Sequence, residues 1–100
     1  MIHHIIMFKL RELSSLSEKL EIVDSIKTAL ETLPSKIEQI KSFEIGKNMI
    51  ESERAFDIVL VSEFESLDDL KIYVDHPEHQ KVVTLIRKYS EKTVSVDYEK

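Results

Sequence analysis

The chain has no cysteine and no tryptophan, and only one glycine and two prolines among its 100 residues. Without cysteine it has no disulfide, no thiolate nucleophile and no cysteine-ligated metal, which fits a reducing, cytoplasmic environment. Because so few residues break regular structure, we expect long helices and strands joined by short polar connections. No apolar run approaches the roughly 20 residues that a membrane span needs, so no membrane partner is expected.

The balance of charge argues against a second class of partner. Acidic residues outnumber basic ones, which gives a net charge of −5, and the basic residues are interspersed with carboxylates. Phosphate neutralisation needs clustered lysine and arginine, so we expect no nucleic-acid binding. With 42% hydrophobic and 33% charged residues, the chain is expected to form one soluble globular domain over residues 1–100. Met1 leads into an apolar, strand-like segment instead of a signal peptide, which also favours a cytoplasmic protein.

The first half of the chain predicts a strand, a helix and a second strand. Residues 2–11 form the first strand, and Ser15 with Glu18 has the spacing of a capping box that starts a helix. Pro34 is expected to end this helix, and residues 37–46 to form the second strand. The helix carries one apolar stripe at three- and four-residue spacing, made of Leu16, Leu20, Val23, Ile26, Leu30 and Leu33.

The second half predicts two more strands and two short helices. Residues 47–54 are expected to form a loop, and residues 55–64, rich in β-branched and aromatic side chains, a central strand. Ser66 would cap a second helix, Pro77 suits the first turn of a third, and residues 93–98 alternate as a last strand. The apolar positions of these helices are Leu67, Leu70, Tyr73 and Val74, then His79, Val82, Val83 and Ile86. The order predicts a ferredoxin-like βαββαβ fold of the α+β class, with helices on one face of a four-stranded antiparallel sheet.

The predicted strands are apolar on both sides. In the first strand Ile5 and Met7 point opposite to Ile6 and Phe8, and the strand over 55–64 shows the same two-sided pattern. An antiparallel sheet with one wet face should alternate cleanly between apolar and polar residues. Leaving several large side chains wet would cost several kcal/mol, comparable with the stability of a whole small domain. We therefore predict a homodimer in which two sheets pack against each other.

The histidines fall into two groups. His3 and His4 open the first strand, whereas His76 and His79 flank the start of the third helix, close to Tyr73. Imidazoles are the side chains best suited to proton transfer or metal ligation near neutral pH. The spacing of His76 and His79 across a proline differs from the metal-binding arrangement on a continuous helix, so no intrinsic metal site is expected.

Three segments together resemble the stress-responsive A/B barrel family, the Dabb domain. These are residues 4–10, residues 56–64 followed by Ser66, and Tyr73 with the motif at residues 76–79, His-Pro-Glu-His. The resemblance covers nearly the whole chain. It implies a dimeric α+β barrel with a cleft in each subunit between sheet and helices. It does not imply one activity, because the family holds proteins linked to stress responses as well as a plant polyketide cyclase.

In the cyclase branch the catalytic pair falls on Tyr73 and His79. The resemblance then implies that His79 removes a proton next to a carbonyl while Tyr73 holds the oxygen as negative charge develops, without a cofactor. The first-strand histidine of that branch matches His4, which would line the same cleft. A further histidine of the cyclase is Asp57 here, a departure from that branch. The walls that would admit an alkyl tail include Phe8, Ile58 and Val83.

Each of these residues also has a purely structural interpretation. His79 would be an imidazole satisfied by a buried partner, and Tyr73 a core residue with its hydroxyl at the rim. His4 would be a packed, hydrogen-bonded histidine, and His76 a cap of the third helix. Asp57 is expected to face the side between the chains and to pair with a lysine or histidine across it.

Three functions therefore remain open. The first is a stress-associated homodimer that binds a small apolar molecule in the cleft near His79 without turnover. The second is a cofactor-free lyase or cyclase that acts on a β-keto or polyketide-like substrate. The third is a heme-binding or monooxygenase-like member of the dimeric α+β barrel group, with a histidine as the axial ligand.

Overall fold

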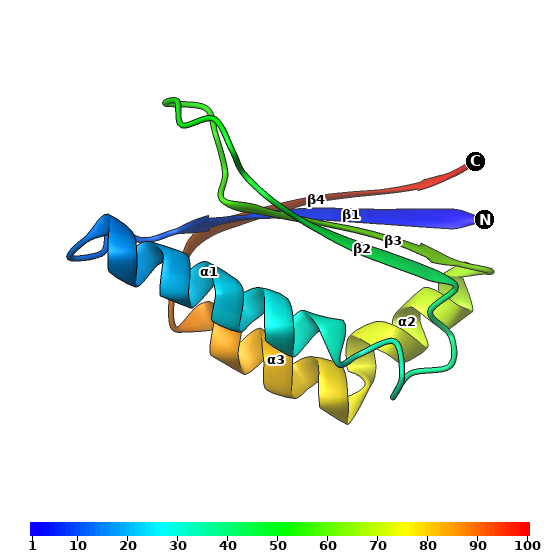
Figure 1. Ribbon diagram of the computed structural model, residues 1–100. Coiled ribbons are helices and arrows are strands. Elements are labelled where there is room, and N and C mark those ends of the chain that lie inside the picture. Colours follow the sequence, from blue (N-terminus) through cyan, green and yellow to red (C-terminus); the bar gives the residue numbers. More distant parts are fainter.

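The predicted ferredoxin-like fold is confirmed by the structure, a computed structural model that describes residues 1–100. Its elements are β1 (Ile2–Leu10), α1 (Leu16–Glu31), β2 (Ser42–Lys47), β3 (Ile58–Phe64), α2 (Leu67–Asp75), α3 (Pro77–Arg87) and β4 (Ser90–Glu99). The strands form one antiparallel sheet in the order β2-β3-β1-β4. All three helices cover the same face of this sheet (Figure 1). None of them is both long enough and apolar enough to cross a membrane.

Helix α1 begins where the capping signal predicts. The Ser15 hydroxyl accepts the Glu18 N–H at 3.1 Å, and the Glu18 carboxylate accepts the N–H of Ser14 at 3.0 Å. Farther along, the stripe made of Val23, Ile26 and Leu30 is buried. The first two leucines of the stripe, Leu16 and Leu20, were expected to be buried but are exposed. They are exposed because the first turns of α1 extend past the strands (Figure 1).

Several predicted strand limits are wrong. The second strand starts at Ser42, and Ile37 lies instead in the turn after α1, where its N–H donates to the Leu33 carbonyl at 3.0 Å. Ile37 is nevertheless in the core. Its apolar side chain thus correctly indicated burial, but it did not indicate a strand. Strand β3 starts at Ile58, because residues 48–57 form a loop that rises from the sheet on the side away from the helices (Figure 1).

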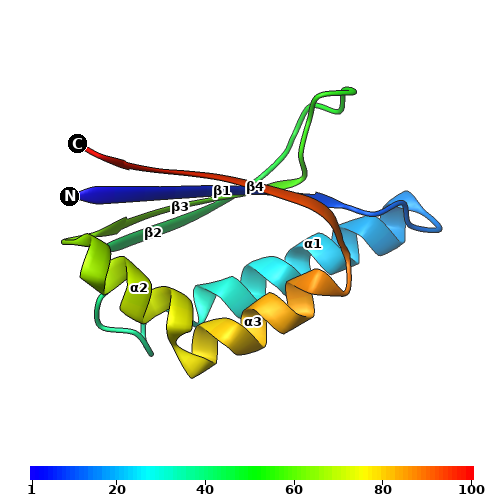
Figure 2. The same ribbon diagram turned by 180° about the vertical axis from the view of Figure 1, so that it is seen from behind.

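The sheet has one covered and one open face. The covered face carries the alternating buried residues of β1 and β3, which pack against the helices. On the other face Ile5 lies opposite Val61 and Val96, and Met7 lies opposite Val59 and Val94. We call these six residues the open face; no helix covers them (Figure 2), and the 48–57 loop lies beside Met7 and Val59. The strands are therefore apolar on both sides, as the sequence predicts.

Helices α2 and α3 meet at the junction predicted from the proline. The hydroxyl of Ser66 accepts the Asp69 N–H at 3.1 Å and caps α2, which buries Leu70 and Tyr73. Two other residues expected on the buried side of α2, Leu67 and Val74, are exposed. Leu70 and Tyr73, three positions apart, therefore form the buried side of α2.

Candidate functional site

A cavity of about 390 Å³ lies between the sheet and helix α3. Its apolar walls come from β1, α1, β3 and α3 and consist of Ile6, Phe8, Leu30, Leu60, Val82, Val83 and Ile86. Tyr73 and His79 complete one part of the lining, and the end of α3 with the first residues of β4 completes the rest. The structure thus gathers four of the predicted site residues around one cavity: Tyr73, His79, Phe8 and Val83. Ile58 is buried in the core and does not line it.

Tyr73 presents a buried hydroxyl without a partner. The residue is fully buried, and its hydroxyl oxygen makes no hydrogen bond within the chain. Its ring packs against Phe64, with the ring centroids 5.0 Å apart. Burial raises the pKa of the Tyr73 hydroxyl, so the group stays protonated and can donate to an acceptor. The hydroxyl therefore lies deeper than the rim position that the structural interpretation expected.

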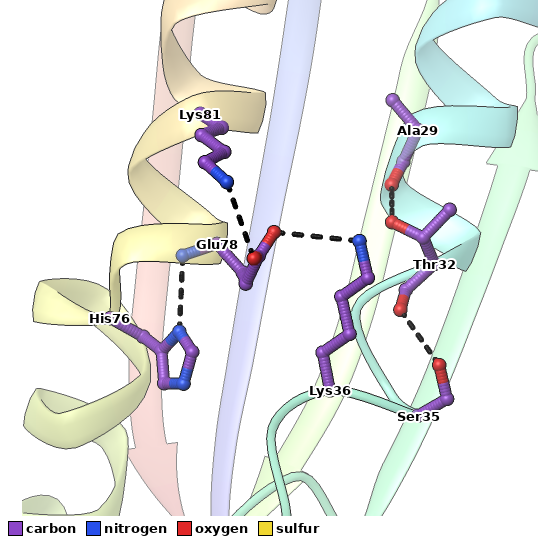
Figure 3. Close-up of polar contacts among 7 residues, drawn as sticks. All are labelled: Ala29, Thr32, Ser35, Lys36, His76, Glu78 and Lys81. Carbon is purple, nitrogen blue, oxygen red and sulfur yellow. Dashed lines mark hydrogen bonds and ion pairs between the residues drawn. The ribbon is translucent and has the colours of Figure 1, made fainter.

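The start of α3 is fixed by a small polar network (Figure 3). The Nδ1 atom of His76 accepts the N–H of Glu78 at 3.1 Å, which makes His76 the N-terminal cap of this helix, as predicted. The Glu78 carboxylate receives Lys81 at 3.3 Å and Lys36 at 3.4 Å, and these contacts hold the pKa of Glu78 below its usual range. Because Lys36 follows α1, the network ties the two helices together directly beside His79.

His79 is held as a neutral imidazole with one free nitrogen. Its Nδ1 donates to the Val74 carbonyl at 2.9 Å, because a carbonyl oxygen can only accept. The lone pair of the neutral ring is then on Nε2. Burial lowers the pKa of His79, and the nearby His4 and His76 lower it further, whereas the bond to Val74 opposes them. The centroid of the ring is 4.3 Å from that of Tyr73.

His4 does not line the cavity, although the resemblance implied that it would, and it packs instead against Tyr73. Its ring meets the Tyr73 ring edge-on with the centroids 6.1 Å apart, and its Nδ1 pairs with the carboxylate of Asp97 on β4. His4 is thus a packed, hydrogen-bonded histidine, as the structural interpretation predicts. Asp97 was not identified from the sequence. The only signal for it is that His4 and Asp97 are opposite each other in the β1–β4 register, which the sequence does not reveal.

Asp57 is not brought to the cavity. It is buried beside the end of β1, where its carboxylate accepts the Leu10 N–H at 2.7 Å and forms an ion pair with Lys19 at 2.8 Å. The partner is a lysine, as expected, but it comes from α1 of the same chain and not from across a subunit interface. The alternation that placed Asp57 on the other side assumed a strand, whereas this residue belongs to the 48–57 loop.

The arrangement suits a ligand that carries a hydrogen-bond acceptor. The apolar walls suit an apolar ligand body, the Tyr73 hydroxyl can supply a donor, and the His79 imidazole can supply an acceptor or base. No three histidine, aspartate or glutamate side chains approach closely enough to hold a metal ion. The Tyr73 hydroxyl and the His79 imidazole can themselves supply hydrogen bonding and proton transfer.

The model of the Stress responsive A/B Barrel Domain family, Dabb, matches residues 2–100. This chain belongs to that family. An uncharacterised protein from Streptomyces coelicolor is 30% identical over 99 residues, which are 99% of each chain. A crystal structure from Bacteroides fragilis, described as a dimeric protein of unknown function with a ferredoxin-like fold, is 41% identical. It covers 99% of this chain and 95% of its own, with a TM-score of 0.89.

One solved structure that shares the fold is described as an enzyme. Hydroxynitrile lyase from Passiflora edulis is 18% identical, covers 97% of this chain and 90% of its own, and has a TM-score of 0.80. At this identity the likeness concerns the architecture alone, because one fold carries many unrelated activities. The family membership therefore agrees with the resemblance stated from the sequence, and the activity has to be argued from the site.

Proposed function

We propose that this protein is a homodimer that binds a small, largely apolar molecule with one carbonyl group in the cavity under α3. The observation that carries the proposal is Tyr73, a residue that lines a largely apolar cavity and whose buried hydroxyl has no partner within the chain. A buried polar group without a hydrogen bond is costly, so a ligand that supplies an acceptor relieves a cost already present in the free protein.

A methyl ketone tests this proposal. 2-Decanone offers one acceptor and an alkyl chain for the apolar walls, and its binding is measured by isothermal titration calorimetry. Tyr73→Phe is expected to weaken binding about fivefold, the equivalent of about 1 kcal/mol for one hydrogen bond. Tyr89→Phe is the matched control, because Tyr89 does not line the cavity. The proposal is wrong if 2-decanone does not bind or binds equally well to Tyr73→Phe.

The homodimer is supported by the open face. Apolar side chains occupy two neighbouring rows of this face, and relatives of known structure such as the Bacteroides fragilis protein are described as dimeric. Packing two such sheets face to face removes both surfaces from water. The 48–57 loop rises on the same side, with Met49 and Ile50 exposed on it, and would reach over the second subunit (Figure 1). Sedimentation analysis at micromolar concentration is expected to give a dimer, and a clean monomer would contradict it.

A second candidate function is proton transfer without a cofactor. It is favoured by the neutral His79, whose Nε2 lone pair is free and whose ring lies beside the Tyr73 donor. In a β-keto compound, Nε2 would take the proton between the two carbonyls, and the C–H electron pair would form an enolate. The Tyr73 hydroxyl would donate to the enolate oxygen as the charge develops.

Deuterium exchange separates this function from binding alone. A β-keto ester in D₂O is followed by NMR, with and without the protein. Protein-catalysed exchange is expected to fall at least about a hundredfold in His79→Ala, the lower end of what a general base contributes. If the exchange rate equals that of the buffer, or if His79→Ala exchanges like the original protein, the chain binds without turnover. The heme-binding alternative stays a prediction of the sequence, and an absorbance titration with heme checks it.

A further inference from the structure

Two lysines flank one end of the open face. Lys9 is two residues beyond Met7 on β1, so the two side chains lie on the same side of the sheet. Lys92 lies directly opposite Lys9 on β4 and shares that side. Neither lysine takes part in an ion pair within the chain, and like charges directly opposite each other are destabilising. We call Lys9 and Lys92 the basic end.

Carboxylates flank the other end of the open face. Glu63 lies opposite His3, and Glu44 lies opposite Val61, so both side chains are on the uncovered side. Neither carboxylate has an ion pair within the chain. We call Glu44 and Glu63 the acidic end; it is the end where the chain termini lie in Figure 1. His3 is six residues before Lys9, so the two ends are roughly 20 Å apart along the sheet.

Two identical faces can pack about a twofold axis in two ways. With the axis along the strands, equal ends meet, so that lysine lies over lysine and carboxylate over carboxylate. With the axis across the strands, one copy is reversed, and each basic end lies over the acidic end of the other copy. Like charges brought together at an interface oppose association, whereas opposite charges fix the register of the two partners.

The spacing of the rows also fits the reversed packing. Along β1 the rows of the open side are those of Glu63, Ile5, Met7 and Lys9, two residues apart. Reversal about the midpoint between Ile5 and Met7 places the row of Lys9 over that of Glu63 and keeps apolar rows against apolar rows. Glu63 is on the strand next to β1, and two long side chains can span the strand spacing of about 5 Å.

We propose that the open face packs against a second copy of the chain with its ends reversed, so that Lys9 pairs with Glu63 of the second copy. The inference rests on the proposed homodimer and specifies how its two copies are oriented. Because the interface is symmetric, the ion pair occurs twice. Lys92 and Glu44 extend the same match between the basic and acidic ends.

Charge reversal tests the orientation. Lys9→Glu places a carboxylate near Glu63 of the second copy and is expected to weaken the dimer at least about tenfold, because two ion pairs are lost and replaced by repulsion. Glu63→Lys should weaken it to a similar extent. A chain with both substitutions re-forms the pairs with exchanged charges, so its dissociation constant should return to within about threefold of the original. Sedimentation across a concentration series at low salt measures all four proteins.

The matched controls are Lys88→Glu and Glu31→Lys. They make the same changes in net charge at exposed residues of the helices that have no ion pair, and they should leave the association unchanged. Circular dichroism shows whether each variant is folded. A tighter dimer in Lys9→Glu would mean that equal ends meet, and it would overturn the inference. A doubly substituted chain that associates as weakly as the two single variants would overturn it too.

Cross-linking of the unmodified chain gives a readout that needs no variant. A carbodiimide joins a lysine amine to a carboxylate only where the two groups touch. Lys9 and Glu63 of one chain are too far apart for this, so a cross-link between them is expected and can come only from two copies. If the chain sediments as a monomer, the proposed homodimer fails and the inference with it. If it is a dimer that charge reversal does not weaken, the homodimer stands and its ends are not reversed.

Discussion

The two faces of the sheet come from the same strands, yet they differ in what covers them and in what they hold. The covered face lies under three helices and contains the buried polar residues His4 and Ser62 together with the cavity of Tyr73. The open face contains no such groups in its centre, only apolar side chains, with Met7 and Val96 among the exposed residues. Within one chain, helices therefore pack against only the covered face of the sheet.

This difference separates stability and recognition. On the covered face the helices bury the Tyr73 phenol and half-bury the His79 imidazole, and a lower local dielectric strengthens any hydrogen bond that a ligand makes there. On the open face the two rows of apolar side chains form a surface without hydrogen-bonding groups. Such a surface suits packing against a second copy of itself. A substitution on one face should therefore change a property that the other face does not control.

The largest effect is expected from Phe64→Ala on the covered face. Phe64 is fully buried and its ring contacts that of Tyr73, so the truncation leaves a cavity and should cost about 3–5 kcal/mol in the free energy of unfolding. Urea denaturation measures the change. Ile72→Ala is the control, because Ile72 is an exposed apolar residue of α2, and it should cost less than about 1 kcal/mol. Equal losses in the two variants would mean that the covered face is not the core.

Met7→Glu is expected to break the other side of the comparison. Met7 is 41% exposed in the single chain, so a carboxylate there should leave the subunit folded. Buried between two sheets it would be an unpaired charge, and the dimer should weaken by about 3 kcal/mol, or about a hundredfold. Sedimentation across a concentration series measures the shift. Thr84→Glu, on the exposed side of α3, adds the same charge and should leave the association unchanged; a matching loss there would point to general charge repulsion.

The element order could be predicted because hydrophobic period and capping residues are local signals. Ser15, Ser66 and Pro77 each stand at the helix start that they predict. Strand limits were less predictable, since an apolar residue such as Ile37 can be buried in a turn as well as in a strand. Likewise, residues 55–57 were predicted as the beginning of a strand but belong to the 48–57 loop.

Local sequence signals predict the members of the site that are close in the chain, whereas Phe8 was expected at the cavity from the family resemblance. Tyr73 and His79 are separated by one helix junction, so their proximity follows from the sequence. The pairing of His4 with Asp97 joins residues 93 positions apart and depends on the register between β1 and β4, which no local pattern determines.

A smaller effect of opposite sign is expected from Tyr73→Phe in the absence of ligand. The substitution removes a buried hydroxyl that has no hydrogen-bond partner and keeps the ring in place. The free energy of unfolding should rise by about 1 kcal/mol, because the desolvation cost of the hydroxyl disappears. Urea denaturation of the ligand-free protein checks this value. A loss of stability would show that the hydroxyl already has a partner in solution, such as a bound water.

The smallest effect concerns pH and again separates the faces. Burial lowers the pKa of His79 in the folded chain, so just below the unfolded value the unfolded chain binds a proton that the folded chain does not. The contribution is therefore complete above about pH 6.5 and is lost as the pH falls toward the folded pKa. In His79→Gln the urea midpoint should fall less between about pH 7.5 and about pH 5.5 than in the original protein. His3→Gln, whose ring stacks on Tyr98 on the uncovered side of the sheet, is the comparison variant. If His79→Gln loses as much stability in acid as the original protein, burial of the His79 imidazole on the covered face does not lower its pKa enough to affect stability.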